Sequence, residues 1–201
     1  QPYLHVGQNK TLRFSSPTQF MAQRKETIDE AWAGDIVGLP DNGIFKIGDT
    51  LTEGEQLHFR GLPSFSPEMF KYIENDDPMK AKQFQKGLEQ LMNEGVAQLF
   101  INQFNGRSIV GTVGQLQFQV IQYRLENEYN AKCRWEPVHL HKACWIESDD
   151  AAELENFKKR KYQYMAKDKD DRDVFLADSS YVLSMAQQDF ENIKFHFTSE
   201  F

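Results

Sequence analysis

The clearest pattern of apolar positions along the chain begins after residue 77. Asp77 and Pro78 offer a helix N-cap and a proline at the first helical position, where a missing N–H is tolerated. Apolar side chains then recur every three or four residues along one helical face, at Ala81, Phe84, Leu88, Leu91 and Met92. Asn93-Glu94-Gly95 supplies a stop signal. The spacing therefore predicts an amphipathic helix from residue 78 to about residue 93.

Two short apolar runs follow that helix and are separated by a turn signal. Residues 97–101 and 108–113 flank Asn105-Gly106, and this dipeptide favours the positive φ angles of a tight turn between strands. The pattern predicts a β-hairpin.

The next segment, residues 115–129, carries two competing periodicities. Residues 116–120 alternate between apolar and polar positions as a strand does. Val120, Ile121 and Leu125, in contrast, have the spacing of an amphipathic helix. Periodicity alone leaves both structures open here.

Beyond residue 130 the pattern alternates between strand-like and helix-like segments. It predicts strands at 133–140, 143–146, 174–177 and 194–197. It also predicts a helix that Asp149-Asp150 opens and that runs to about Ala166, and a second helix at 183–193. The core predicted for this part of the chain consists of Phe84, Leu88, Leu91, Leu99, Ile109, Phe118, Ile121 and Leu125.

Residues 1–61 have a different texture and are predicted to be β-rich. Short apolar runs such as Ile36-Val37 and Ile44-Phe45 stand between turn residues, and Pro40-Asp41-Asn42-Gly43 is a turn signal. The stretch Gly61–Pro67 is rich in residues that end helices and strands, so we place a boundary there. The predicted class is α+β: a β segment at 1–61, then an α/β domain at 62–201 with helices packed on sheets.

Composition and charge exclude several classes of protein. The chain has 201 residues and a net charge of 23 − 30 = −7, so it is not a globally basic nucleic-acid binder, although a local basic face remains possible. It contains no run of about 18 apolar residues, and two cysteines form no disulfide framework in a chain of this size. We expect an acidic, soluble, cytosolic protein whose Gln1 marks a processed or excised end.

Two stretches imitate nucleotide-binding motifs. Residues 43–50 have the glycine spacing of a phosphate-binding loop, but Asp49 stands where a lysine must contact the phosphates. Asn9-Lys10-Thr11-Leu12 resembles a guanine-reading motif but ends in leucine instead of the carboxylate that the base requires. Neither stretch predicts nucleotide binding.

Candidate metal and catalytic groups are equally weak. His139, His141 and Cys144, with Cys133 nearby, could supply zinc ligands, but their spacing matches no familiar zinc module. Residues 168–173 imitate a calcium loop but carry an aspartate at the position that needs glycine, so we interpret them as a solvated acidic loop. We therefore expect no catalytic, cofactor-binding or metal-binding residue in this chain.

Basic residues are concentrated at two places. Lys158-Lys159-Arg160-Lys161 is the only run of four, and on a helix its members surround the axis. Contacts to RNA phosphate and a merely solvated helix explain this run equally well. Arg24-Lys25, which we place in a loop of the β segment, is the second candidate.

Two groups of motifs resemble known families. Residues 33–39 (AGDIVGL) followed by 47–51 (IGDTL) resemble the second-domain barrel of translational GTPases. Sharper motifs lie at residues 78–100, 110–118 and 124–130, and together they resemble the bacterial class II peptide-chain release factors, often called release factor three. Elongation factor G carries a related pattern, but Glu94-Gly95-Val96 and Gly114-Gln115-Leu116-Gln117 depart from it toward the release factor.

The resemblance implies a fold for the whole chain. It makes residues 115–129 a helix and residues 1–61 the later strands of a partial β-barrel, the second domain of a translational GTPase. Residues 62–140 become a ferredoxin-like unit similar to domain III of elongation factor G, and residues 141–201 a C-terminal α/β extension.

The resemblance also implies a function. The family binds GTP and Mg²⁺ in a GTPase domain whose motifs this chain lacks, so the region is expected to be a non-catalytic arm that docks on the ribosome. It would contact ribosomal RNA and ribosomal proteins, and its own GTPase domain, and would indirectly promote recycling of class I release factors in the cytoplasm, with no membrane involved. Arg24, Lys25, Lys158, Lys159, Arg160 and Lys161 are the candidate ribosome contacts. The corresponding region of elongation factor G is the alternative, and a metal- or thiol-dependent enzyme using His139, His141 and Cys144 is a remote one.

Overall fold

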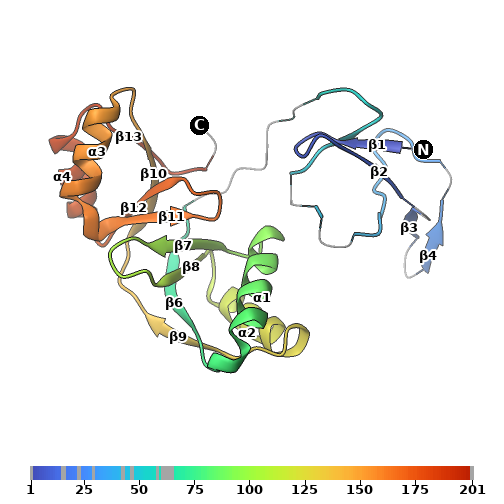
Figure 1. The fold of residues 1–201 in the computed structure, drawn as a ribbon, viewed down its shortest axis with the longest axis horizontal. Coiled ribbons are helices and arrows are strands. Elements are labelled where there is room, and N and C mark those ends of the chain that lie inside the picture. The colour runs from blue at the N-terminus through green and yellow to red at the C-terminus, as the bar shows by residue number, and fades with distance from the viewer. Residues whose placement is uncertain are drawn as a thin grey trace. The chain divides into compact units, whose positions relative to one another are not determined.

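The chain folds into two compact units, Gln1–Leu62 and Pro63–Phe201 (Figure 1). The computed structural model describes residues 2–14, 17–21, 24–28, 30–41, 44–45, 48–57, 59 and 66–199. The predicted turn at Asn42-Gly43 and most of the boundary signal at 61–67 lie outside the described residues. Each unit is therefore considered by itself.

The described part of the first unit contains five short strands. β1 (Pro2–His5) pairs with β2 (Lys10–Arg13) and with β5 (Leu51–Thr52) in an antiparallel sheet. β3 (Thr18–Met21) and β4 (Arg24–Thr27) form a separate antiparallel pair. The apolar runs 36–37 and 44–45 lie outside these strands, and the side chain of Ile36 is 87% exposed, so apolar character alone was a poor guide to strand position in this unit.

A buried histidine joins distant parts of the first unit. The Nδ1 atom of His5 accepts a hydrogen bond from the backbone N–H of Gln8, at 3.1 Å. The Nε2 atom therefore carries the proton and donates to the Asp49 carboxylate, at 2.9 Å. The ring of His5 also stacks on Phe45. Asp49, which stands at the lysine position of the phosphate-loop look-alike, thus bonds to a residue of its own unit.

The second unit repeats one supersecondary pattern twice. Its first half runs β6 (Met69–Asn75), a 3₁₀ turn (Pro78–Lys80), α1 (Ala81–Asn93), β7 (Gln98–Asn102), β8 (Ser108–Thr112), α2 (Gln115–Glu128) and β9 (Cys133–Pro137). Its second half runs β10 (Lys142–Glu147), α3 (Ala151–Arg160), a 3₁₀ turn (Tyr162–Tyr164), β11 (Met165–Asp168), β12 (Asp173–Ala177), α4 (Ser180–Asp189) and β13 (Lys194–His196). Each half is a βαββαβ unit of the ferredoxin-like type.

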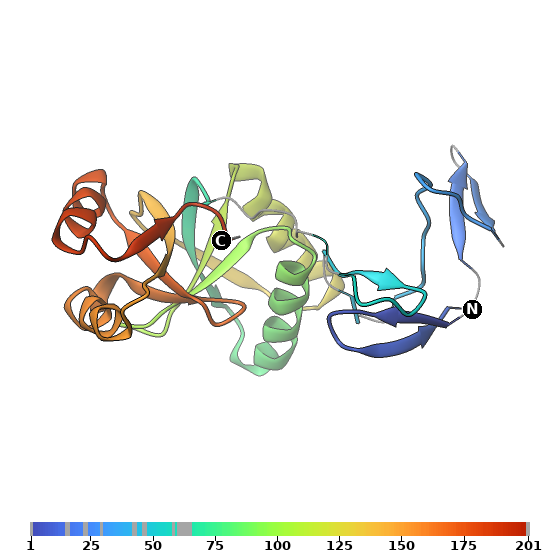
Figure 2. The same ribbon diagram turned by 90° about the horizontal axis from the view of Figure 1, so that it is seen from above.

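One eight-stranded antiparallel sheet joins the two halves (Figure 1, Figure 2). Its strand order is β13-β10-β12-β11-β7-β8-β6-β9, so each half contributes four strands in ferredoxin-like order. The halves meet where β11 pairs with β7, with Ala166 opposite Asn102 and Asp168 opposite Phe100. The segment that we expected to be a C-terminal extension is therefore a second repeat whose strands continue the first sheet.

Three apolar clusters hold this unit together. α1 and α2 cover one cluster, with Leu88, Leu91, Ile121 and Leu125 each at most 1% exposed. α3 and α4 cover a second, built around Phe157 and Phe175. The third lies on the opposite face of the sheet, because Phe100 and Ala166 alternate along their strands with residues that face the helices. All members of the predicted core are buried except Leu99, which is partly buried, and Ile109 lies in the third cluster instead of under the helices.

Several predicted elements are confirmed. The Asp77 carboxylate accepts a hydrogen bond from the backbone N–H of Met79, and the Asp150 carboxylate caps α3. Residues 115–128 are helical, and the side chain of Gln117 accepts hydrogen bonds from the backbone N–H groups of Val113 and Gly114. The resemblance, rather than periodicity, predicted this helix.

Several predicted boundaries are wrong, among them the end of the last helix, which lies at Asp189 and not at residue 193. The helix opened by Asp150 ends at Arg160 and not at Ala166, because Met165 and Ala166 enter the sheet between β7 and β12. The predicted strand 133–140 ends at Pro137. The last helix begins at Ser180, three residues early, because the hydroxyl of Ser179 caps it through the N–H of Val182.

Candidate functional site

The basic run lies at the C-terminal end of α3. Lys158, Lys159 and Arg160 form the last turn of the helix, and Lys161 is its C-cap. Cations at this position interact favourably with the negative end of the helix dipole. The run therefore contributes to helix stability, and its availability for a ligand depends on what else each side chain contacts.

Two of the four cations are engaged by carboxylates. The Nζ atom of Lys158 lies 2.8 Å from Glu155 and 3.1 Å from Asp173. The hydrogen bond to Glu155, helped by Asp173, raises the pKa of Lys158 and keeps it charged. Lys161 lies 3.8 Å from a carboxylate oxygen of Asp189.

The other two cations are exposed. Neither Lys159 nor Arg160 has a carboxylate partner among the described residues, and both side chains face solvent. The guanidinium carbon of Arg160 lies 5.3 Å from the centre of the Phe190 ring, which holds this side chain against the surface. The structure thus separates the basic run into an engaged pair and an accessible pair.

Arg24 and Lys25 were expected in a loop, and that expectation is wrong. They are the first two residues of β4, where Arg24 pairs with Met21 and Lys25 with Phe20 across an antiparallel ladder. They belong to the first unit and α3 to the second, so each basic candidate is considered within its own unit.

An exposed aromatic pair lies next to the basic run and was missed by the sequence analysis. The rings of Phe104 and Tyr162 meet in an edge-to-face arrangement with centroids 6.0 Å apart, and their exposures are 64% and 49%. Phe104 belongs to the loop between β7 and β8, whereas Tyr162 follows α3. The two residues come from different repeats. The pair can therefore be predicted only when the pairing of β7 with β11 is known.

The metal and thiol chemistry considered above finds no support. His139 and His141 lie in the connection after β9, outside any strand, and no group of three or more ligand-type side chains assembles in the described part of the chain. Cys133 and Cys144 are free and buried. Burial raises the pKa of each thiol to about 12, so the reactive thiolate form is scarce near neutral pH.

The calcium-loop look-alike is not a solvated acidic loop throughout. The Asp168 carboxylate is buried and accepts hydrogen bonds from the indole N–H of Trp145 and from the side chain of Arg172, both at 2.9 Å. Its other oxygen accepts from the backbone N–H groups of Asp170 and Arg172. Asp168 therefore shapes the β11–β12 turn and ties it to β10.

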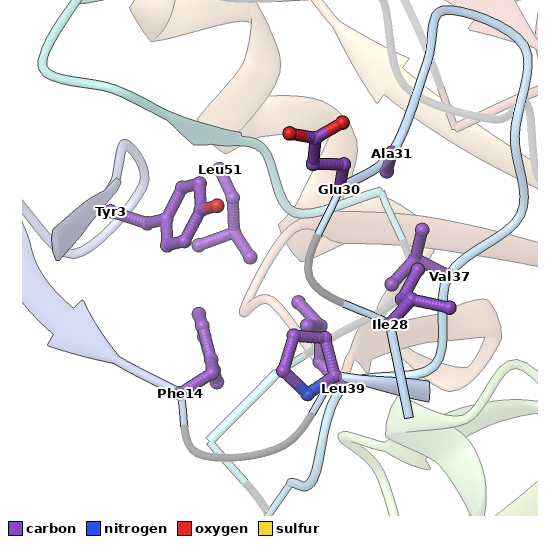
Figure 3. A pocket seen from close by; sticks show the side chains of 9 residues that line it. Tyr3, Phe14, Ile28, Glu30, Ala31, Val37, Leu39 and Leu51 are labelled. Atoms are coloured by element: carbon purple, nitrogen blue, oxygen red, sulfur yellow. The ribbon is translucent and has the colours of Figure 1, made fainter. Parts of the chain in front are cut away.

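The first unit contains a cavity of about 400 Å³ (Figure 3). Apolar side chains line most of it, among them Tyr3, Phe14, Leu39 and Leu51, and Glu30 is the one charged residue among the described lining residues. The aromatic and aliphatic side chains face one another across the opening. Without several converging polar groups, the cavity resembles core space more than a catalytic pocket.

Comparisons with known proteins divide the chain in the same manner as its fold. Residues 1–54, which contain β1 to β5, match the family model of elongation factor G domain 2. Residues 59–187, well over half of the chain, match the model described as class II release factor RF3, C-terminal domain. The chain belongs to the class II release factor family. Its second unit is thus the C-terminal region of a release factor of the RF3 type, a translational GTPase.

A solved structure supports the fold. The protein described as ttk003000868, from Thermus thermophilus, matches with a TM-score of 0.53 and 18% sequence identity, over 74% of this chain and 25% of that chain. At this identity the likeness concerns the fold alone. The release-factor chain spans about a quarter of that protein's length. In the described part of the release-factor chain, no helix is both long and apolar enough to cross a lipid bilayer.

Proposed function

We propose that this region docks a class II release factor on the ribosome and helps it recycle class I release factors. In this proposal GTP and Mg²⁺ bind in a separate GTPase domain, and the present region follows the nucleotide state of that domain as a rigid body. It has no catalytic or cofactor-binding role of its own. Its partners are ribosomal RNA, ribosomal proteins and its own GTPase domain, in the cytoplasm.

The observation that carries the proposal is the match of residues 59–187 to the C-terminal domain of these release factors. Two features of the structure support it. The chain has a net charge of −7, so approach to RNA requires local positive charge, and Lys159 and Arg160 supply it on an exposed surface. The repeats also share one continuous sheet, which suits an element that must move as a unit.

The test compares two double variants with the same change of net charge. Lys159→Gln with Arg160→Gln removes the accessible pair, whereas Lys158→Gln with Lys161→Gln removes the engaged pair. Cosedimentation of each protein with purified ribosomes is measured over a range of salt concentrations.

We expect the first double variant to associate more weakly. The negative slope of log K against log salt should become shallower by about 1–2, because a complex with fewer phosphate contacts releases fewer counterions. The second should keep the wild-type slope. Equal slopes for wild type and both variants would show that the run is only a solvated helix end, and no association of the wild-type chain would refute docking by this region.

A further inference from the structure

Phe104 and Tyr162 form an exposed pair of contacting aromatic rings on the surface of the second unit. Exposed apolar side chains that lie together mark interaction sites, and these two rings, which contact each other, are 64% and 49% exposed. We propose that they form a stacking platform for an unpaired nucleotide of RNA, flanked by the accessible cations of α3. This inference rests on the proposed function and names the kind of RNA that the docking surface takes.

The platform is held in place before any ligand arrives. The hydroxyl of Tyr162 donates to the carbonyl of Gln103, at 2.8 Å. The Asn102 side chain accepts hydrogen bonds from the backbone N–H groups of Phe104 and Asn105, at 2.9 and 3.2 Å, and so fixes the loop that carries Phe104. Little conformational entropy is therefore lost when a ligand binds.

The geometry of the pair leaves a ring face free. The planes of the two rings are 76° apart, so the ring that points edge-on keeps both of its faces clear of its partner. In both views the tip of the β7–β8 hairpin lies beside the end of α3 (Figure 1, Figure 2). A base that has left its helix can stack on such a face, whereas a base inside a duplex cannot.

The charges around the platform favour a nucleic acid over an acidic protein surface. Lys159 lies one helical turn before Tyr162 and is exposed, with no carboxylate partner among the described residues. The nearby carboxylates of Glu155 and Asp189 are occupied by Lys158 and Lys161. Aromatic rings for the bases beside cations for the phosphates are the combination that single-strand binders use.

The same junction has room for a neighbouring nucleotide. A cavity of about 300 Å³ is lined by residues of both repeats. Asn102 and Gln163 are among them, and they lie one or two residues from the aromatic pair along the chain. The acidic Asp178 also lines this cavity, so the cavity would take the base of the neighbouring nucleotide and not its phosphate.

The experiment uses the whole chain and a single-stranded RNA of about eight nucleotides with 2-aminopurine at its centre. Stacking on an aromatic ring quenches the fluorescence of 2-aminopurine, so one titration gives both affinity and stacking. The same RNA annealed to its complement is the competitor. The variants are Phe104→Leu and Tyr162→Leu, which remove a ring, and Phe104→Trp and Tyr162→Phe, which keep one.

The matched control is Tyr123→Leu, because Tyr123 is a 66% exposed aromatic residue on α2, away from the pair in sequence and in element. Circular dichroism checks that every variant is folded. We expect the two ring-removing variants to bind about tenfold more weakly and to lose quenching. Phe104→Trp and Tyr123→Leu should stay within about twofold of the wild type. Tyr162→Phe keeps the ring but loses the hydrogen bond to Gln103, so it should retain the quenching.

The outcomes separate this inference from the proposed function. Wild-type affinity and quenching in both ring-removing variants overturns the platform, even if the chain cosediments with ribosomes. An equal loss in Tyr123→Leu shows unspecific binding and also overturns it. If Phe104→Leu loses ribosome association while its affinity for the RNA is unchanged, the platform contacts a protein and the RNA proposal is wrong. Ring-dependent RNA binding by a chain that fails to cosediment supports the platform and refutes docking instead.

Discussion

The substitution Leu88→Ala tests the assignment of the buried face of α1. Leu88 is 1% exposed and packs in the cluster beneath α1 and α2. The substitution removes the equivalent of three methylene groups, worth about 0.8 kcal/mol each, or about 2.4 kcal/mol in transfer free energy. A cavity term adds to this value, since measured Leu→Ala losses lie at about 2–5 kcal/mol.

The surroundings of Leu88 place the expected loss in the middle of that range. A Cβ atom on the neighbouring Gly87 would lie only 2.6 Å from the Tyr129 ring, so α1 and the end of α2 are already in close contact. Ile121 and Leu125 are fully buried on the facing helix. Side chains held this tightly cannot collapse into the new space, and alanine recovers only a few tenths of a kcal/mol through helix propensity. We expect a loss of about 3–4 kcal/mol.

Urea unfolding followed by tryptophan fluorescence measures this loss. The ring of Trp135 lies 5.1 Å from that of Phe118 in the same cluster, so its emission reports directly on the site. The buried Trp145 of the third cluster reports on the same second unit, whereas Trp32 of the first unit is 76% exposed and should change little on unfolding. The control is Leu116→Ala on the exposed face of α2, at 68% exposure, with an expected loss below about 0.5 kcal/mol. A loss of that small size for Leu88→Ala, at an unchanged m value, would refute the assigned helix face.

Two further predictions concern chemistry that the chain should lack. We expect no saturable micromolar binding of a fluorescent guanine nucleotide, because Asp49 bonds to the buried His5 where a phosphate loop needs lysine, and Leu12 replaces the aspartate that reads guanine. Binding at a single site would contradict this. Cys133 and Cys144 should resist a thiol reagent in the native protein at about pH 8 and react after unfolding, because burial raises the pKa of both thiols to about 12. Rapid labelling of the folded chain would show that one thiol is accessible.

The candidate site illustrates how far sequence reasoning reaches. The sequence predicted the basic run 158–161 and its place on a helix. It did not predict which of the four cations bind carboxylates. Their difference comes from carboxylates that reach them from elsewhere, since Asp173 and Asp189 belong to β12 and α4. Sequence periodicity does not report such contacts.

The sequence by itself determined the local features of this protein. Asp77-Pro78, Asn105-Gly106 and Asp150 act through their own backbone and near neighbours, so their effects can be predicted from position alone. The buried face of α1 was predictable for the same reason, because a 3.6-residue period fixes which side chains share a face.

The tertiary structure decided everything that depends on partners far along the chain. Met165 and Ala166 were predicted to end a helix but begin β11, because two neighbouring strands satisfy their backbone hydrogen bonds and bury their side chains. The pairing of β11 with β7 then joins two similar repeats into one sheet and brings Phe104 to Tyr162. Local propensity differs by less than about 1 kcal/mol per residue, whereas burial of one large apolar side chain contributes about 1.5–3 kcal/mol, so the long-range contacts prevail.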